Sequence, residues 1–254
     1  MKNILLIIFG LAFLNTVYAQ KPRIYKVDKE NILRGIFGNY NKDQSESFWV
    51  TSDTAILNKL GIISNKDTIF TSVLKLDTIV FNSTKYLLII TQTKPKEYDC
   101  HSCAPLIGII LFSKLSDYWE FYSRYYITSI GSWGRAARPK LEHIGKDKFG
   151  ISFKYGFTAQ GYSSLSFLIF EIRLNSCRRI LNITDYSADN LGNCDEKKST
   201  CWAYTSDYSF DISKKEYFDI IVKTKGTKLI SSKIVPIDNI KGYNFLGSSY
   251  IEKL

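Results

Sequence analysis

Cys100, His101 and Cys103 are the residues of this sequence best suited to chemistry, because they lie within one tetrapeptide. The first chemistry that the spacing permits is a local disulfide. The second is thiol redox, because a neighbouring histidine lowers the pKa of a thiol and favours the reactive thiolate. The third is metal binding, in which the sulfurs and the imidazole are ligands and Asp99 or His143 completes a tetrahedral set.

The neighbouring sequence favours a structural disulfide. Residues 105–110, after Cys103, form an apolar run typical of a strand, whereas a redox-active thiolate is commonly stabilised by a helix N-terminus. A structural zinc site also needs a second spaced pair of cysteines or histidines. We therefore expect no cofactor and no metal, and a thiol-redox or metal-dependent enzyme centred on this segment is the alternative.

The three other cysteines are Cys177, Cys194 and Cys201. A disulfide between Cys194 and Cys201 would close a short loop and stabilise the fold by about 2 to 3 kcal/mol on a chain-entropy estimate. Cys177 follows an apolar strand, so we expect a free thiol that fills space in the core. Disulfides of this kind are typical of an oxidising compartment.

A basic loop over residues 131–140 contains Trp133, Arg135 and Arg138. Two arginines beside a tryptophan can hold a carboxylate, a phosphate or a sugar acid through bidentate hydrogen bonds and stacking. A glycine-punctuated turn at residues 155–162 places Gln160 and Tyr162 between two expected strands. The hypothesis is that both loops line one concave binding surface; the alternative is a plain connection whose tryptophan covers the edge of the core.

An acidic stretch near the third and fourth cysteines supplies oxygen atoms suited to calcium, but it lacks the ligand spacing of an EF-hand. We expect a solvated loop there. The acidic stretch consists of Asp185, Asp189, Asn190, Asn193, Asp195 and Glu196.

Catalytic signatures are scarce, because neither histidine lies near a Gly-x-Ser-x-Gly motif, and an enzyme is not the expected class.

The N-terminus has the pattern of a signal peptide. Lys2 gives a positive start, residues 4–14 are almost continuously apolar, and Val17 and Ala19 stand at the positions that a signal peptidase reads. The apolar run is too short to span a bilayer of about 30 Å as a helix. We expect residues 1–19 to be removed and the remainder to be secreted or periplasmic, without a transmembrane segment.

The hydrophobic pattern predicts a mainly β fold, an antiparallel sheet sandwich or barrel-like assembly with few short helices. Asp28 and Asp53 are the expected N-caps of two helices, which end near Phe37 and Leu60. No linker divides the chain, so residues 20–254 are expected to form a single β-rich domain. Turns are expected at residues 82–83, 145–148 and 225–226. Strands are expected over residues 68–76, 78–81, 85–93, 106–112, 119–130, 149–155, 165–174, 202–210 and 217–224.

The chain is basic, with 34 lysines and arginines, 24 acidic residues and a formal net charge of +10. The cations are scattered rather than gathered in one arm, so nucleic acid is not an expected partner. An anionic envelope surface, a carbohydrate or a protein ligand suits the charge and the aromatic loops, although a genome of low GC content would produce the same composition without selection. We predict an exported cell-envelope protein whose role is binding or interaction.

Overall fold

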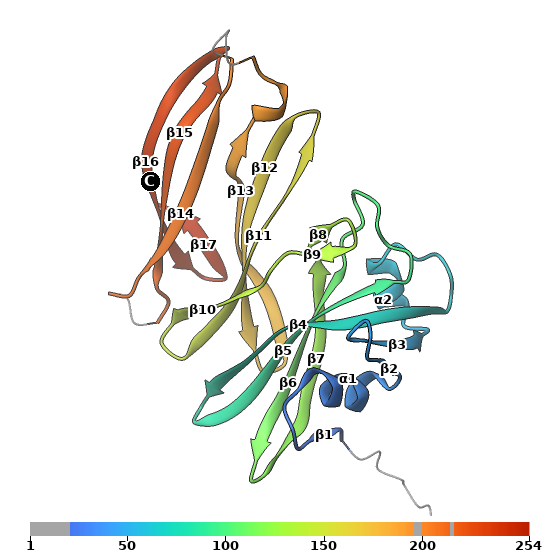
Figure 1. Cartoon of the computed structure of the whole chain (residues 1–254). Helices are drawn as coiled ribbons and strands as arrows, with labels where there is room; N and C mark the ends of the chain where they lie inside the picture. Colours follow the sequence, from blue (N-terminus) through green and yellow to red (C-terminus); the bar gives the residue numbers. More distant parts are fainter. Residues whose placement is uncertain (1–20, 196–199, 214–215, 254) are drawn as a thin grey trace, which may run out of the picture.

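The computed structural model describes residues 21–195, 200–213 and 216–253, and the predicted signal peptide over residues 1–19 lies outside the described residues. Two large antiparallel sheets make up most of the fold and pack against each other (Figure 1). A short two-stranded ribbon lies between them in the chain. The predicted mainly β, sandwich-like fold is confirmed.

The N-terminal sheet has seven strands in the order β1-β7-β6-β5-β4-β3-β2. Strands β2 to β7 form an antiparallel meander, and β1 pairs with β7 at the edge. The strands are β1 (Arg23–Ile24), β2 (Tyr40–Asn41), β3 (Glu46–Thr51), β4 (Asp67–Phe81), β5 (Thr84–Pro95), β6 (Leu106–Leu115) and β7 (Tyr118–Ser129).

Two helices begin at the predicted caps. The Asp28 carboxylate accepts a hydrogen bond from the Asn31 amide (2.8 Å) at the start of α1 (Lys29–Phe37). Asp53 caps α2 (Thr54–Lys59) in the same way. Helix α1 covers the face of the N-terminal sheet that points away from the second sheet. Within the described residues, no helix has the length and hydropathy needed to cross a membrane.

The C-terminal sheet has eight strands in chain order. It bends between β13 and β14, because these strands share only two residue pairs. Its last four strands consequently fold over the first four (Figure 1), and Phe167 on β12 shares a buried cluster with Ile220 and Val222 on β15. The strands are β10 (Lys140–Gly145), β11 (Lys148–Ala159), β12 (Tyr162–Arg173), β13 (Ser176–Asp189), β14 (Ala203–Asp211), β15 (Asp219–Ile230), β16 (Lys233–Leu246) and β17 (Ser249–Glu252).

A buried apolar cluster joins the two sheets. Leu88 and Ile109 of the N-terminal sheet and Phe153 of the C-terminal sheet are fully buried in it, and Leu168 is almost so. The Cys177 thiol is free and packs against this cluster, as predicted. A short ribbon, β8 (Gly131–Ser132) paired with β9 (Arg135–Ala136), lies next to this cluster, because Ala136 packs against it.

The predicted turns at residues 82–83 and 145–148 are confirmed, whereas the turn at residues 225–226 is wrong. Gly226 lies inside β15 with φ +137°, where a Cβ would overlap the backbone of Ala203 on β14, so the glycine permits close strand approach. The expected strands 68–76 and 78–81 form one strand, β4, with a register shift between Val73 and Lys75. Strands β13 and β16 were not expected, because charged residues and Pro236 obscure their alternation.

Candidate functional site

Trp133 lies at the turn of the β8–β9 ribbon in an unusual backbone conformation. Trp133 (φ +52°) and Gly134 (φ +64°) are the two central residues, and both have the positive φ that a type I′ turn requires. Asparagine, aspartate and glycine are preferred there, and a bulky side chain in the left-handed region costs about 1 to 3 kcal/mol. The tryptophan is nevertheless 57% exposed, so this conformation presents its ring to solvent.

The loop that contains Cys100 and Cys103 fixes this turn. The two cysteines form a disulfide, and the Cys103 carbonyl oxygen accepts a hydrogen bond from the Gly134 amide (2.8 Å). A Cβ at position 134 would overlap the carbonyl oxygen of Tyr98, so only glycine fits. The Lys94 ammonium donates to the Gly134 carbonyl oxygen (3.1 Å). The turn is therefore held from the N-terminal sheet and from the disulfide loop.

His101 links the disulfide loop to the second sheet. Its ring meets the Trp133 ring edge to face, with centroids 5.2 Å apart and an interplanar angle of 88°. Its Nε2 lies 3.2 Å from the carbonyl oxygen of Thr158 on β11. The exposed tryptophan is thus supported on one side by an imidazole that is itself anchored to β11.

The surroundings of the Cys100–Cys103 disulfide can be compared with the redox and metal chemistry predicted for this segment. The chain continues from this loop into a strand, β6, so the sulfurs do not lie at a helix N-terminus. His143 lies on β10 against the Phe149 ring (centroids 4.7 Å apart). No group of three or more metal-ligating side chains occurs among the described residues. The local geometry gives the disulfide a supporting role for Trp133.

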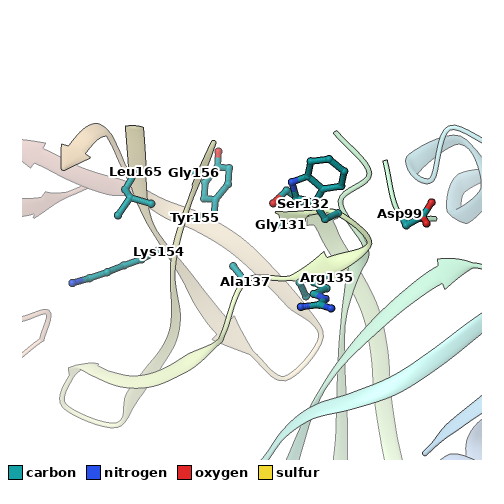
Figure 2. Close-up of a pocket in the computed structure, with 11 residues that line it drawn as sticks. Asp99, Gly131, Ser132, Arg135, Ala137, Lys154, Tyr155, Gly156 and Leu165 are labelled. Carbon is teal, nitrogen blue, oxygen red and sulfur yellow. The ribbon is translucent and has the colours of Figure 1, made fainter. Parts of the chain in front are cut away.

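A cleft of about 720 Å³ separates the ribbon from strands β11 and β12. Figure 2 shows Ser132 and Arg135 on the ribbon, opposite Tyr155 and Leu165. A smaller hollow of about 400 Å³ shares Trp133 and Leu165 with it and adds His101 and Phe157. We call the two together the aromatic cleft. It is lined by Asp99, His101, Gly131–Trp133, Arg135–Ala137, Lys154–Thr158, Ser163 and Leu165.

The aromatic cleft has an exposed apolar surface and one available cation. Phe157 is 59% exposed and Leu165 40% exposed. The Lys154 side chain runs away from the ribbon (Figure 2), and its ammonium lies over the Tyr186 ring (4.9 Å). Arg135 is exposed and has no hydrogen-bond, ion-pair or ring partner among the described residues. Its guanidinium is therefore free to meet a ligand.

Some residues of each of the two predicted loops, 131–140 and 155–162, line the aromatic cleft, and the others do not. Trp133 and Arg135 do share the aromatic cleft with the β11–β12 hairpin. Gln160 and Tyr162 lie at the tip of that hairpin, beyond the residues that line the cleft. Arg138 lines an adjoining cleft with Arg135. Phe157, from the predicted 155–162 turn, does line the aromatic cleft. His101 and Leu165 were not predicted to belong with this surface, because their convergence depends on the packing of two sheets.

The acidic stretch considered for calcium was expected to be a solvated loop, but Asp185 and Asp189 lie on strand β13 and only the following residues form a loop. The Asp185 carboxylate accepts from the Ser164 hydroxyl (2.8 Å), and the Asp189 carboxylate from the Leu191 amide (3.1 Å). The predicted Cys194–Cys201 disulfide is present and closes the loop. Glu196 lies outside the described residues. The two aspartates therefore have a structural role, since Asp185 joins β13 to β12 and Asp189 holds the start of the loop.

A second cluster, around Glu171 on β12, was not predicted from the sequence. Glu171 is 4% exposed, and its carboxylate accepts hydrogen bonds from Tyr217 (2.5 Å), Arg178 (2.7 Å) and Arg173 (3.0 Å). Burial raises the pKa of this carboxyl, but the hydrogen bonds and the two arginine charges outweigh burial and leave the pKa below its usual value. A cleft of about 720 Å³ adjoins the two arginines and Tyr217. A single buried acid among apolar residues carries no sequence signal of its partners.

Comparison of the chain with protein-family models, with curated proteins and with solved structures finds no match. A function must therefore be inferred from the clefts and the residues that line them.

Proposed function

We propose that this chain is an exported binding module of the cell envelope and that its ligand occupies the aromatic cleft, with Trp133 as the principal contact. The supporting observation is the exposed tryptophan ring in a left-handed turn conformation. Strained conformations of this kind persist only where the surrounding structure holds them, and they are frequent at ligand contacts. In this protein the disulfide loop, through its hydrogen bond to Gly134, and the His101 ring stabilise the conformation of Trp133.

The residues of the cleft suit a carbohydrate. Exposed aromatic rings give a flat apolar platform, and Trp133 and Phe157 provide two such rings near one guanidinium. A cleft with apolar walls and a few polar groups is the usual form of a small-ligand site. A sugar ring, with apolar faces and a hydroxylated rim, complements such a surface.

The proposal places the protein outside the cytoplasm. Two disulfides are present, and disulfides persist mainly in oxidising compartments. The predicted signal peptide over residues 1–19 supports the same location. Envelope and extracellular glycans are therefore the ligands to which the aromatic cleft would be exposed.

The test is an array of neutral and acidic oligosaccharides, followed by calorimetric titration of the sugars that bind. Trp133→Ala is expected to weaken binding about thirtyfold or more, because truncating a central aromatic contact that acts as a hot spot removes about 2 kcal/mol or more of binding free energy. Tyr25→Ala is the control, since Tyr25 directly follows β1, is 68% exposed and is not among the residues that line the aromatic cleft. Sugar binding that survives Trp133→Ala unchanged would refute the proposal, as would the absence of any glycan ligand.

A further inference from the structure

A second cleft adjoins the aromatic cleft, and Arg135 and Ala136 line both. It has a volume of about 470 Å³ and lies between the β9 end of the ribbon and strands β4 and β5. We call it the basic cleft. Its lining residues are Val73, Leu74, Lys75, Gln92, Arg135, Ala136, Arg138 and Pro139.

Every charged side chain that lines the basic cleft is cationic. Lys75 forms an ion pair with Asp77 (3.3 Å) and is the partnered member. Arg135 and Arg138 are exposed and have no hydrogen-bond, ion-pair or ring partner in the part of the chain that the structure describes. Both arginines line the same cleft without an acid among its lining residues, so an anion bound there would meet two cations.

Hydrogen bonds from the N-terminal sheet fix the backbone that carries these arginines. The Gln92 side chain accepts a hydrogen bond from the Ala136 amide (3.0 Å) and donates one to the Ser72 hydroxyl (3.0 Å). The amide group of Gln92 therefore fastens the ribbon to strands β4 and β5. The backbone between the two arginines is consequently positioned by the sheet, although their guanidinium groups remain free.

We infer that the ligand of the aromatic cleft is an acidic saccharide, whose ring lies on Trp133 and whose carboxylate or phosphate is held by Arg135 and Arg138. This inference rests on the proposed function and adds the charge of the ligand to it. Arg135 borders both clefts, so one ligand can reach the tryptophan and the second arginine together. Guanidinium groups bind carboxylate and phosphate oxygens in bidentate geometry, which a neutral sugar cannot use.

The experiment compares matched ligands on matched variants. Calorimetry with trigalacturonic acid and with its neutral methyl ester measures the value of the carboxylate, and mannose 6-phosphate against mannose measures that of the phosphate. Arg138→Gln removes one guanidinium from the basic cleft and leaves the lining of the aromatic cleft intact. Arg179→Gln is the control, because Arg179 is an exposed arginine on β13 that lines neither cleft.

The wild-type protein is expected to bind at least one acidic sugar about tenfold more tightly than its neutral counterpart, as one charge-assisted contact allows. Arg138→Gln should reduce that preference to roughly threefold or less, whereas Arg179→Gln should preserve it. The pair that shows the preference identifies the anion as carboxylate or phosphate. Equal binding of acidic and neutral sugars would overturn the inference and leave the proposed function standing. Failure of both acidic sugars to bind would also overturn the inference, whereas the proposed function is decided by the oligosaccharide array.

Discussion

The basic cleft and the Glu171 cluster each contain two arginines at the surface, but the two pairs differ in their partners. Arg173 and Arg178 both donate to the buried Glu171 carboxylate, at 3.0 and 2.7 Å. Arg135 and Arg138 have no partner among the described residues. The first pair neutralises a charge that the fold has buried, whereas the second pair adds a charge that the fold does not need.

This difference separates structural from functional cations. A buried carboxylate without partners would be costly, so the arginines beside Glu171 are required by the folded state itself. The arginines of the ribbon could be removed without leaving an orphaned group. Mutations at the two clusters should therefore affect different measurements: stability at the Glu171 cluster and ligand affinity at the ribbon.

The largest effect on stability is expected from Glu171→Gln. The change leaves two arginines and the Tyr217 hydroxyl without their charged acceptor, and unfolding free energy should fall by about 2 to 4 kcal/mol, less than for a fully buried pair because the arginines reach solvent. Urea denaturation measures it. Glu216→Gln is the control, since the Glu216 side chain is 84% exposed and lies 3.9 Å from Lys148. Equal stability of the two variants would remove the contrast between the clusters.

Gly134→Ala should destabilise by about 1 to 3 kcal/mol, because it combines a positive φ with a clash against Tyr98. Gly247→Ala separates the two causes: Gly247 has φ +60°, but a Cβ there meets nothing within 4 Å. Thermal melting of both variants should show the larger loss at position 134, together with weaker ligand binding. If position 134 tolerates alanine as well as position 247 does, the disulfide loop does not fix the turn.

The pH dependence of stability sharpens the comparison further. The pKa of Glu171 is lowered in the folded state, so its contribution to stability is present above the unfolded-state pKa of about 4.3 and is lost as pH falls through the folded-state pKa. The unfolding free energy of the wild-type protein should therefore decline below about pH 4.5. Glu171→Gln should flatten this decline, and Arg138→Gln should leave it unchanged. Denaturant titrations between pH 3 and 7 on the three proteins measure it.

The sequence predicts those features that local rules determine. Asp28 and Asp53 cap helices as expected, because a cap needs only its own next residues. The expected pairing of Cys194 with Cys201 follows from short spacing. The sheet order, the bend after β13 and the partners of Glu171 depend on contacts between residues far apart in the chain. The sequence therefore identifies Trp133, Arg135 and the 155–162 turn as candidates, whereas only the packing of the two sheets places His101 and Leu165 beside them.

The smallest expected change in stability is the most informative about the ribbon. Trp133→Asn puts a residue that tolerates the left-handed region at the first central position of the turn, so stability should stay the same or rise by up to about 1 kcal/mol, even though the His101 contact is lost. Ligand affinity should fall at least as far as in Trp133→Ala. Thermal melting and calorimetry on the same sample give both values. A clear loss of stability would mean that the tryptophan serves the fold, like Glu171, whereas unchanged stability with lost binding assigns the conformational cost of Trp133 to ligand recognition.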